Sequence, residues 1–412
     1  MSKSGDISKP HLHTPSASEG AAVKALDTLL QQCVREGASD IHFESGEGTF
    51  RIRYRIDGLL HTSSVTPMSL RDALISRVKV LAKMDIAEKR LPQDGRFKYV
   101  FENSSVDLRV SSLPTIHGEK LVIRILNFNQ TRPHLEDLGY EPDDQARLLA
   151  AIQRPHGMVL LTGPTGSGKT LSLYSCLDFL NLSNINISTV EDPSEIVVQG
   201  INQVNVNERA GLTFANTLRA MLRQDPDVIM VGEIRDVETA EIAIQAAQTG
   251  HLVLSTLHTN DAPSTLARLH HMGIAPFNVA ASVILITAQR LVRRLCNQCK
   301  LPMDETLCTP FREIFLTIPQ SIWTLQELRT RPLFHAVGCG ACDHGYKGRV
   351  GIYQVMPIST SLQALILANS DAQTLAHQAA AEGVRTLRQA GWLKVVQGIT
   401  SVQEIMALTQ HA

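Results

Sequence analysis

Hydrophobic positions recur at two different periods in the N-terminal part of the chain. Between residues 21 and 34 the apolar side chains recur every three or four residues, which predicts a helix with Gly37 just beyond its end. From Phe50 onward apolar residues alternate with arginines up to Asp57-Gly58, which predicts a half-buried strand entering a tight turn. The same patterns predict further strands and helical structure at 41–43, 97–101, 106–110, 120–126 and around 69–84. Residues 20–128 are therefore expected to form a small α+β domain.

The pattern changes beyond residue 134. Short runs that are apolar at every position replace the alternation, and segments with helical spacing separate them. These runs lie at 157–162, 186–190, 228–232 and 252–257. Strands that are apolar on both faces are buried on both faces, and strands that alternate with helices form parallel sheets. We therefore expect a parallel α/β domain over residues 135–290.

The first of these apolar runs leads directly into a glycine-rich loop. The loop fits the pattern G-x-x-x-x-G-K-[ST] and consists of Gly163, Pro164, Thr165, Gly166, Ser167, Gly168, Lys169 and Thr170. Its N–H groups and the dipole of the helix that follows would attract phosphate, Lys169 would neutralise the β and γ phosphates, and Thr170 would ligate Mg²⁺. The alternative is an ordinary glycine-rich turn, which the flanking strand and helix disfavour. The loop therefore predicts binding of a nucleoside triphosphate.

Two acidic residues follow later apolar runs. Glu191 comes after 186–190 and Glu233 comes after 228–232. Ligands of open α/β sheets bind at the C-terminal ends of the strands, so both carboxylates are candidate catalytic residues. One would hold Mg²⁺, for which we name Glu191 together with Thr170, and the other would orient the attacking water, but the pattern leaves open which does which. The alternative for each is a carboxylate that caps a helix.

Two histidines bracket the run 252–257. His251 and His258 are seven residues apart, so on an extended strand they point to opposite sides. His258 lies at the carboxyl end and is expected near the γ-phosphate as a sensor. His251 lies at the other end, where it is either a structural histidine or part of a domain or subunit contact.

Four of the seven cysteines form two C-x-x-C pairs. Cys296 and Cys299 make the first pair, and Cys339 and Cys342 make the second. Together they supply the four soft ligands of a tetrahedral structural Zn²⁺ site. The segment between the pairs is longer than in the usual zinc ribbon, and a redox pair is the alternative, which two separated pairs disfavour. We expect a zinc module over 291–355 and a C-terminal helical region over 356–412.

Composition narrows the class of protein. With 412 residues, of which 43% are hydrophobic, the chain is expected to be globular with two to four domains. Lys and Arg number 39 against 40 Asp and Glu, so no basic field attracts nucleic acid and no such partner is expected. Residues 1–19 lack the apolar core of a signal peptide, and the longest apolar stretch, 279–288, is about half a membrane span. These features predict a disordered tail at 1–19, a linker at 129–134 and a cytoplasmic location.

Several longer motifs resemble a single superfamily of ATPases. In the N-terminal part these are residues 39–44, 51–58, 91–96 and 113–120. In the central part, residues 191–193, 222–236 and 249–261 are similar to the Asp box, the Walker B motif and the His box of the GspE/PilB/PilT superfamily. The four cysteines and residues 345–353 resemble the tetracysteine zinc module of the GspE/PilB branch.

The resemblance implies a fold, a set of cofactors and further site residues. It implies a RecA-like P-loop ATPase domain behind a PAS-like α+β domain, in a homohexameric ring that binds ATP, Mg²⁺ and Zn²⁺, with each ATP between the two domains. Arginines of the N-terminal module would complete catalysis, and by motif position the candidates are Arg96, Arg109 and Arg124, with Arg96 first. The alternative for each is a solvated or salt-bridged strand arginine. Arginines 51, 53 and 55 are expected to form a subunit or domain contact face.

The resemblance also implies a function. ATP hydrolysis would drive domain rotations that act on a polytopic inner-membrane platform protein, which adds pilins or pseudopilins to a filament. A retraction motor of the PilT kind shares the catalytic motifs but generally lacks the four cysteines. Two more candidates are a RecA-like nucleic-acid motor and a non-hydrolysing ring component. Members of the GspE/PilB branch carry an additional N-terminal domain for docking to the inner membrane, and residues 1–19 leave the mode of docking open.

Overall fold

The computed structural model describes residues 17–63, 68–101, 104–126, 134–315 and 325–409. The chain divides into two compact units, Met1–Thr131 and Arg132–Ala412, and each has its own hydrophobic core. Residues 1–16 of the predicted tail and 129–133 of the predicted linker lie outside the described residues. Residues 17–19 were predicted as tail but belong to the first helix, because the helical pattern extends further toward the N-terminus.

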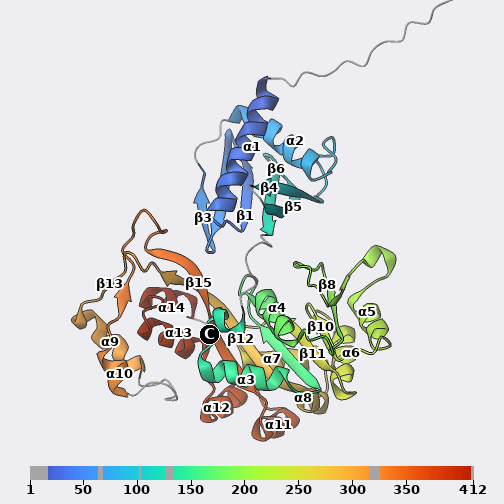
Figure 1. Ribbon diagram of the computed structural model, residues 1–412, viewed down its shortest axis with the longest axis vertical. Helices are drawn as coiled ribbons and strands as arrows, with labels where there is room; N and C mark the ends of the chain where they lie inside the picture. Colours follow the sequence, from blue (N-terminus) through green and yellow to red (C-terminus); the bar gives the residue numbers. More distant parts are fainter. Residues whose placement is uncertain (1–16, 64–67, 102–103, 127–133, 316–324, 410–412) are drawn as a thin grey trace, which may run out of the picture. The chain divides into compact units, whose positions relative to one another are not determined.

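The N-terminal unit is a six-stranded sheet with helices on one face (Figure 1). The strand order is β3-β2-β1-β6-β5-β4, and each neighbouring pair is antiparallel. The elements are α1 (Ala17–Arg35), β1 (Asp40–Gly46), β2 (Thr49–Ile56), β3 (Leu59–Thr62), η1 (Met68–Leu70), α2 (Arg71–Leu81), β4 (Gln93–Phe101), β5 (Ser104–Thr115) and β6 (Gly118–Leu126). The predicted α+β composition is confirmed, and the hairpin turns at Asp57 and Gly58, whose φ values of 47° and 90° suit a tight two-residue loop.

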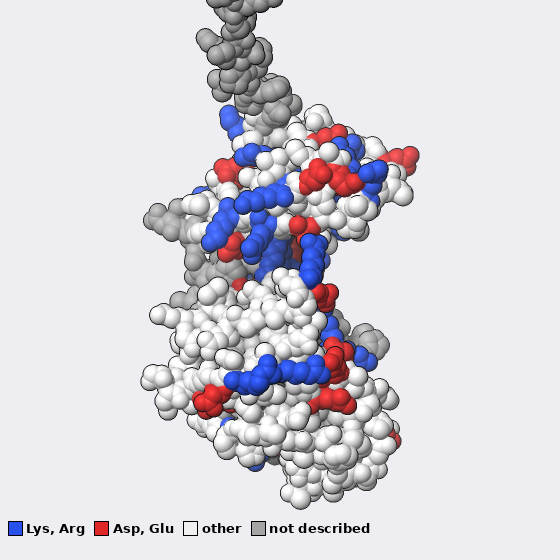
Figure 2. Space-filling view, turned by 90° about the vertical axis from the view of Figure 1, so that its right-hand side faces the viewer, with Lys and Arg blue, Asp and Glu red and all other residues white. Residues whose placement is uncertain are grey.

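The two faces of this sheet differ in chemistry. Inward-facing residues such as Phe43, Leu108 and Ile123 are fully buried against α1 and α2. Successive side chains of a strand point to opposite faces, so the residues next to these, including Arg109 and Arg124, project from the other face of the sheet. Figure 2 shows lysine and arginine side chains gathered on the surface of this unit, with acidic side chains beside them. One face therefore forms the core and the other presents charge.

The C-terminal unit is built on a seven-stranded sheet of order β15-β12-β7-β11-β10-β8-β9. All neighbouring pairs are parallel except β15 with β12. The strands are β7 (Gly157–Thr162), β8 (Ile187–Glu191), β9 (Asn202–Asn205), β10 (Val228–Val231), β11 (Leu252–Leu257), β12 (Val283–Leu295) and β15 (Tyr346–Pro357). Strands β7, β8, β10 and β11 are buried at every position, which accounts for their largely apolar sequences. Their C-terminal ends lie along one edge of the sheet.

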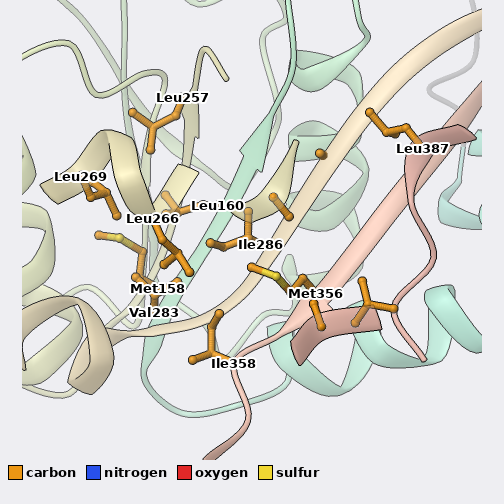
Figure 3. Close-up of a cluster of buried hydrophobic side chains, with 14 of the residues drawn as sticks. Met158, Leu160, Leu257, Leu266, Leu269, Val283, Ile286, Met356, Ile358 and Leu387 are labelled. Carbon is orange, nitrogen blue, oxygen red and sulfur yellow. The ribbon is translucent and has the colours of Figure 1, made fainter. Parts of the chain in front are cut away.

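Helices cover both faces of this sheet (Figure 1). They are η2 (Leu135–Leu138), α3 (Pro142–Ile152), α4 (Lys169–Leu180), η3 (Glu208–Ala210), α5 (Phe214–Met221), α6 (Val237–Gln248), α7 (Ala262–His271) and α8 (Pro276–Ser282). Val159 packs on the side of α3 and α4, whereas Met158 and Leu160 pack on the side of α6 and α7. Figure 3 shows Met158 and Leu160 together with Leu266 and Ile286. Among the helices that the structure describes, none combines the length and apolar character that crossing a membrane requires.

The segment predicted as a zinc module shares the main sheet. Strand β12 continues through the predicted boundary at residue 290, and β15 continues through the one at 355. The two strands pair from Leu285 opposite Pro357 to Leu295 opposite Tyr346, so their ends are set by pairing rather than by a change in composition. Between them lie β13 (Leu301–Pro302), α9 (Glu305–Phe315), α10 (Leu325–Thr330) and β14 (Phe334–His335). The predicted C-terminal region contains α11 (Thr360–Leu367), α12 (Ala372–Ala381), α13 (Leu387–Val396) and α14 (Val402–Leu408).

Candidate nucleotide site and metal cluster

The glycine-rich loop joins the end of β7 to the start of α4. Strand β7 ends at Thr162 and α4 begins at Lys169. The three glycines of the loop, Gly163, Gly166 and Gly168, have φ values of 149°, 78° and 89°, which residues with a side chain rarely adopt. The first N–H groups of a helix have no partner within the helix and attract anions. The structure thus places the loop in the strand-to-helix setting that a phosphate-binding loop requires.

Lys169 is folded back onto the loop. Its Nζ donates hydrogen bonds to the carbonyl oxygens of Gly163 at 2.7 Å and Pro164 at 3.2 Å. Burial lowers the pKa of Lys169 to about 8, although the carboxylate of Glu233 acts in the opposite direction. The ammonium group therefore lies against the loop, and its protonation depends on the groups around it. An incoming phosphate would offer it a stronger partner than two backbone carbonyls.

Glu233 lies just beyond β10, and its carboxylate contacts two side chains that can carry positive charge. Its Oε2 is 3.4 Å from Nε2 of His258, and its Oε1 forms an ion pair with Arg235. Arg235 also lies 3.5 Å from a carboxylate oxygen of Asp192. The structure therefore brings Glu233 and His258 together at the sheet edge that carries the loop. Arg235 belongs to one of the motifs named above, but the sequence did not predict its role. Its partners Asp192 and Glu233 follow two different strands, β8 and β10, and no local pattern links them.

Glu191 is the last residue of β8 and is almost completely buried. Its Oε2 accepts a hydrogen bond from the Tyr174 hydroxyl at 2.5 Å. Its Oε1 accepts from Thr189 Oγ1 at 2.7 Å and from Gln203 Nε2 at 3.2 Å. Burial and the adjacent Glu191 carboxylate raise the pKa of Tyr174, which keeps its hydroxyl protonated as a donor. A carboxylate has about four lone-pair sites, so Glu191 retains capacity for a metal-bound water.

The partners of Glu191 were missed by the sequence analysis. Thr189 stands two residues before it on the same strand, so the period of two could have placed both side chains on one face. Tyr174 and Gln203 belong to α4 and β9, and nothing in the local pattern links them to β8. The network holds the Glu191 carboxylate in one orientation.

His251 lies at the opposite end of β11 from His258. Its Nδ1 is 3.0 Å from the carbonyl oxygen of Ala246 near the end of α6. Its backbone N–H bonds to the same carbonyl at 3.1 Å. These contacts attach the residue to the preceding helix and support the structural alternative for His251.

The four cysteines of the two C-x-x-C pairs lie together, with all four sulfur atoms within 4.8 Å of one another. The Sγ atoms of Cys296 and Cys339 are 3.9 Å apart, those of Cys299 and Cys342 are 3.7 Å apart, and those of Cys339 and Cys342 are 3.6 Å apart. A tetrahedron with Zn–S bonds of about 2.3 Å has edges of about 3.8 Å. The spacing of the thiols therefore fits one tetrahedral zinc ion. The long segment between the pairs is no obstacle, because β12 and β15 bring its ends together.

The three candidate arginines of the N-terminal unit form one row. Arg96 pairs with Arg109 across β4 and β5, and Arg109 pairs with Arg124 across β5 and β6. Directly opposed residues of an antiparallel sheet project from the same face. Asp40 continues the row on β1 and accepts a hydrogen bond from Arg124 Nε at 3.1 Å. On its other side Asp40 stands opposite Arg55 of β2, so the row places this carboxylate between Arg124 and Arg55 on one face of the sheet.

The arginines of β2 are engaged within the same unit. Arg51 and Arg53 both bind Glu44, at 2.9 and 2.6 Å, and Arg55 donates to the carbonyl oxygen of Gly58 at 2.5 Å. Ion pairs at this degree of exposure contribute little to folding stability. A role of these arginines as a contact face is therefore compatible with the fold.

Residues 16–407 match the family described as type II/IV secretion system proteins. The chain is 52% identical over 396 residues to the type IV pilus assembly ATPase PilB of Acinetobacter baylyi, covering 95% of this chain and 67% of that protein. It is 45% identical over 398 residues to the type II secretion system ATPase E of Vibrio cholerae, covering 96% of this chain and 77% of that protein.

Two solved structures resemble this fold. The pilus retraction motor PilT with bound ADP superposes with a TM-score of 0.60 and 25% identity, covering 92% of this chain and 95% of that chain. The ATPase DotB of Legionella pneumophila superposes with a TM-score of 0.68 and 21% identity, covering 94% of this chain and 96% of that chain. The second likeness concerns the fold alone. Both structures agree with the predicted combination of an α+β unit and a P-loop unit.

Proposed function

The chain belongs to the family of type II/IV secretion system proteins, and we propose that it is an ATPase motor that drives assembly of pilin or pseudopilin filaments. One observation carries this proposal. A phosphate-binding loop, Glu233 and His258 converge at one sheet edge of a unit that also holds a tetrahedral set of four thiols. The relatives that share this chain's sequence at about half of its positions are named as assembly and secretion ATPases.

The geometry supports a division of roles at the loop. Lys169 and the N–H groups at the start of α4 would bind the phosphates, with Thr170 as the hydroxyl ligand for Mg²⁺. When bound, Mg²⁺ would neutralise charge on the phosphate oxygens. Glu233 would orient the attacking water and accept its proton, because its carboxylate is less enclosed than that of Glu191. Glu191, fixed by three donors, would hold a water of the metal's coordination shell.

Groups outside the loop complete the proposed motor. The row formed by Arg96, Arg109 and Arg124 would stabilise charge on the transferred phosphate, and its concentration of cationic groups supports this role. We also propose a homohexamer that acts on a polytopic inner-membrane platform protein from the cytoplasmic side. The resemblance of the sequence motifs supports both points. The net charge of only −1, without an excess of basic residues, supports a protein partner over a nucleic acid.

The cysteine cluster supports assembly over retraction. Retraction motors share the catalytic motifs, and the likeness to PilT extends over most of this chain. The tetracysteine module is a feature of the assembly and secretion branch, and here the four thiols are spaced for one zinc ion. The cluster is the observation that separates the two functions.

Replacing Glu233→Gln tests the proposed chemistry. The amide keeps the size of the side chain but cannot accept a proton, so kcat should fall by about 10²–10³-fold while the Kd for Mg-ATP stays within a few fold. ATP turnover and ATP affinity would be measured on the full chain. The matched control is Glu238→Gln, since Glu238 is an exposed carboxylate on α6 whose described ion pair is with Arg219 of α5.

Two results would contradict the proposal. Unchanged turnover in Glu233→Gln would show that Glu233 takes no part in hydrolysis. A strong, salt-sensitive rise in ATPase activity on addition of DNA would favour a nucleic-acid motor instead.

A further inference from the structure

Gln289 on β12 lies directly against the phosphate-binding loop. Its side chain is 1% exposed, and its Nε2 donates a hydrogen bond to the backbone carbonyl oxygen of Ser167 at 2.8 Å. Ser167 stands between Gly166 and Gly168 in the loop. Gln289 and Ser167 are 122 positions apart in the chain. A residue far from the loop in sequence therefore holds one of its peptide groups.

This hydrogen bond fixes the direction of the next N–H group in the loop, that of Gly168. Peptide bonds that do not precede proline are trans, and in a trans peptide the C=O and the N–H point in opposite directions. Because Gln289 holds the Ser167 carbonyl on the side of β12, the Gly168 N–H is turned toward the opposite side, where the phosphates of a nucleotide would bind. A loop without this contact could rotate the peptide and present an oxygen to the anion.

Gln289 also explains two of the glycines. A Cβ on Gly163 would overlap the backbone carbonyl oxygen of Gln289, and a Cβ on Gly168 would lie 3.3 Å from Gln289 Nε2. Both glycines have positive φ, but at these two positions the space itself is occupied by β12. The loop is therefore packed against this strand as well as being hydrogen-bonded to it.

The amide contributes through its donor. Within the part of the chain that the structure describes, Gln289 Oε1 is buried and has no hydrogen-bond partner. Reversing the amide would place Oε1 against the Ser167 carbonyl oxygen, which would be repulsive. An apolar side chain of equal length would fill the same space without a buried, unpaired carbonyl oxygen. It would also leave the Ser167 carbonyl oxygen without its donor, so the two effects on stability oppose each other. Stability alone therefore gives no clear reason for an amide here, whereas the contact to Ser167 requires an N–H donor.

The strand that carries Gln289 is held on both sides. Strand β12 pairs with β7 up to Ala288 opposite Thr162, and with β15, where Gln289 stands opposite Tyr353. Tyr353 is buried, and its ring stacks on Tyr140 with 3.6 Å between the ring centres. The Gln289 amide thus projects from an interior strand, one residue beyond the last pair of β12 with β7 and opposite a buried tyrosine of β15.

We propose that Gln289 is a positioning residue for nucleotide binding, which orients the Ser167–Gly168 peptide so that its N–H faces the phosphates. The proposal rests on the nucleotide-dependent function proposed above. Gln289 does not itself touch the nucleotide and acts through the backbone of the loop. Its role concerns every nucleotide whose phosphates bind this loop, so ATP and ADP should be affected alike.

Two variants of the full chain test the proposal. Gln289→Met keeps an unbranched side chain of similar size but removes the donor, and should weaken Mg-ADP and Mg-ATP binding by about tenfold. Gln289→Glu removes the donor and adds a negative charge beside the loop, so its loss of affinity should be larger. The melting temperature of nucleotide-free Gln289→Met should stay close to that of the wild type, because removal of the unpaired Oε1 offsets the loss of the donor to the Ser167 carbonyl oxygen.

The control is the same change on the neighbouring strand. Gln354 on β15 is also buried, but its Oε1 accepts a hydrogen bond from the N–H of Ala262 at the start of α7. Glutamate keeps that acceptor, and a helix start favours a negative charge. Gln354→Glu should therefore bind Mg-ADP with wild-type affinity. Gln289→Glu loses a hydrogen-bond donor and Gln354→Glu keeps its acceptor, so the two variants make the same change at two buried positions of one sheet with different expected results.

The outcomes separate the two proposals. Wild-type affinity for Mg-ADP in both Gln289 variants would overturn the role of Gln289 and leave the ATPase function standing. A loss of affinity accompanied by an equal loss in stability of the nucleotide-free Gln289→Met protein would show a merely structural role. Failure of the wild-type chain to bind Mg-ADP or Mg-ATP would overturn the proposed function itself.

Discussion

The phosphate-binding loop and the cysteine cluster are both attached to the ends of sheet strands, but different forces hold them. The loop is held by the protein's own hydrogen bonds, from Lys169 to the Gly163 carbonyl and from Gln289 to the Ser167 carbonyl. The cluster consists of four sulfur atoms between 3.6 and 4.8 Å apart, a spacing that fits a shared metal ion. The loop is therefore preorganised without its ligand, whereas the cluster is expected to depend on its ligand for cohesion.

This difference separates the expected effects of mutation. A change in the loop should abolish chemistry and leave the folded state stable, because the surrounding sheet remains intact. A change in the cluster should destabilise the module between β12 and β15 and affect chemistry much less. The following experiments test that separation, beginning with the largest expected effect.

Replacing Lys169→Ala should give the largest loss of activity. The cation that faces the β and γ phosphates disappears, so kcat/KM for ATP should fall by about 10³-fold or more. The melting temperature of the nucleotide-free protein should not fall, because a buried cation with a lowered pKa is removed. Steady-state ATPase assays and thermal unfolding would be compared with Lys24→Ala, a change at an exposed position of α1.

A large drop in melting temperature for Lys169→Ala would contradict the comparison. It would show that the two carbonyl contacts of Lys169 stabilise the whole folded unit and not only the shape of the loop. Activity near the wild-type level would show that the loop is not the site of ATP hydrolysis.

Sequence patterns predict those parts of the site that depend on one strand end. The apolar run 252–257 coincides with β11, and the C-terminal ends of parallel strands share an edge, so Glu233 and His258 could be placed near the loop. The two C-x-x-C pairs could be joined because thiolate chemistry favours four ligands on one zinc ion. In both cases local patterns combine with one general rule, on strand ends or on zinc ligands, to place the residues together.

The parts that were missed depend on contacts between helices and strands that are separate in the sequence. The Tyr174 and Gln203 contacts to Glu191 follow from the position of β8 between β10 and β9. Gln289 contacts the loop only because β12 lies beside β7 in the sheet. The sheet order is set by the packing of both faces, and no pattern within one segment encodes it. The boundary at 290 was placed inside β12 for the same reason.

Removing a cysteine tests the other half of the comparison. The wild-type chain should contain one zinc ion, and Cys339→Ser should lose it, because serine is a poor ligand for zinc in a thiolate site. A loss of about 3 kcal/mol would lower the melting temperature by about 6–12 °C in a unit of this size. Nucleotide affinity should change less than about threefold, on the order of the scatter between independent sites. Metal analysis, thermal unfolding and Mg-ADP titration provide the three measurements.

The control for this change is Cys308→Ala. Cys308 lies between the two pairs in the sequence but is not part of the four-thiol cluster, so the zinc content should stay at one per chain. A wild-type protein purified without oxygen that contained no zinc would contradict the metal assignment and weaken the case for assembly over retraction. A Cys339→Ser protein that lost nucleotide affinity in parallel with zinc would show that the two sites are coupled through β12.

The smallest expected effect is a proton taken up by Lys169. Burial lowers its pKa to about 8, so at pH 8 about half of the nucleotide-free molecules carry a neutral amine. Bound phosphate favours the charged form, so Mg-ADP binding should take up about half a proton and weaken as the pH rises from about 7 to about 9. The effect on folding has the opposite sign. Because the pKa of Lys169 is lower in the folded state, this group destabilises the fold below about pH 8. That destabilisation is relieved as the pH rises from about 8 toward the ordinary pKa of lysine.

Calorimetric titration with Mg-ADP at about pH 8, in buffers of different ionisation enthalpy, measures this uptake directly. The observed enthalpy should depend on the buffer in the wild type and not in Lys169→Arg, because arginine stays protonated throughout this range. Equal enthalpies in all buffers for the wild type would place the pKa of Lys169 well above 8. The lysine would then be held charged before the nucleotide arrives, and the loop would be preorganised in its charge as well as in its backbone.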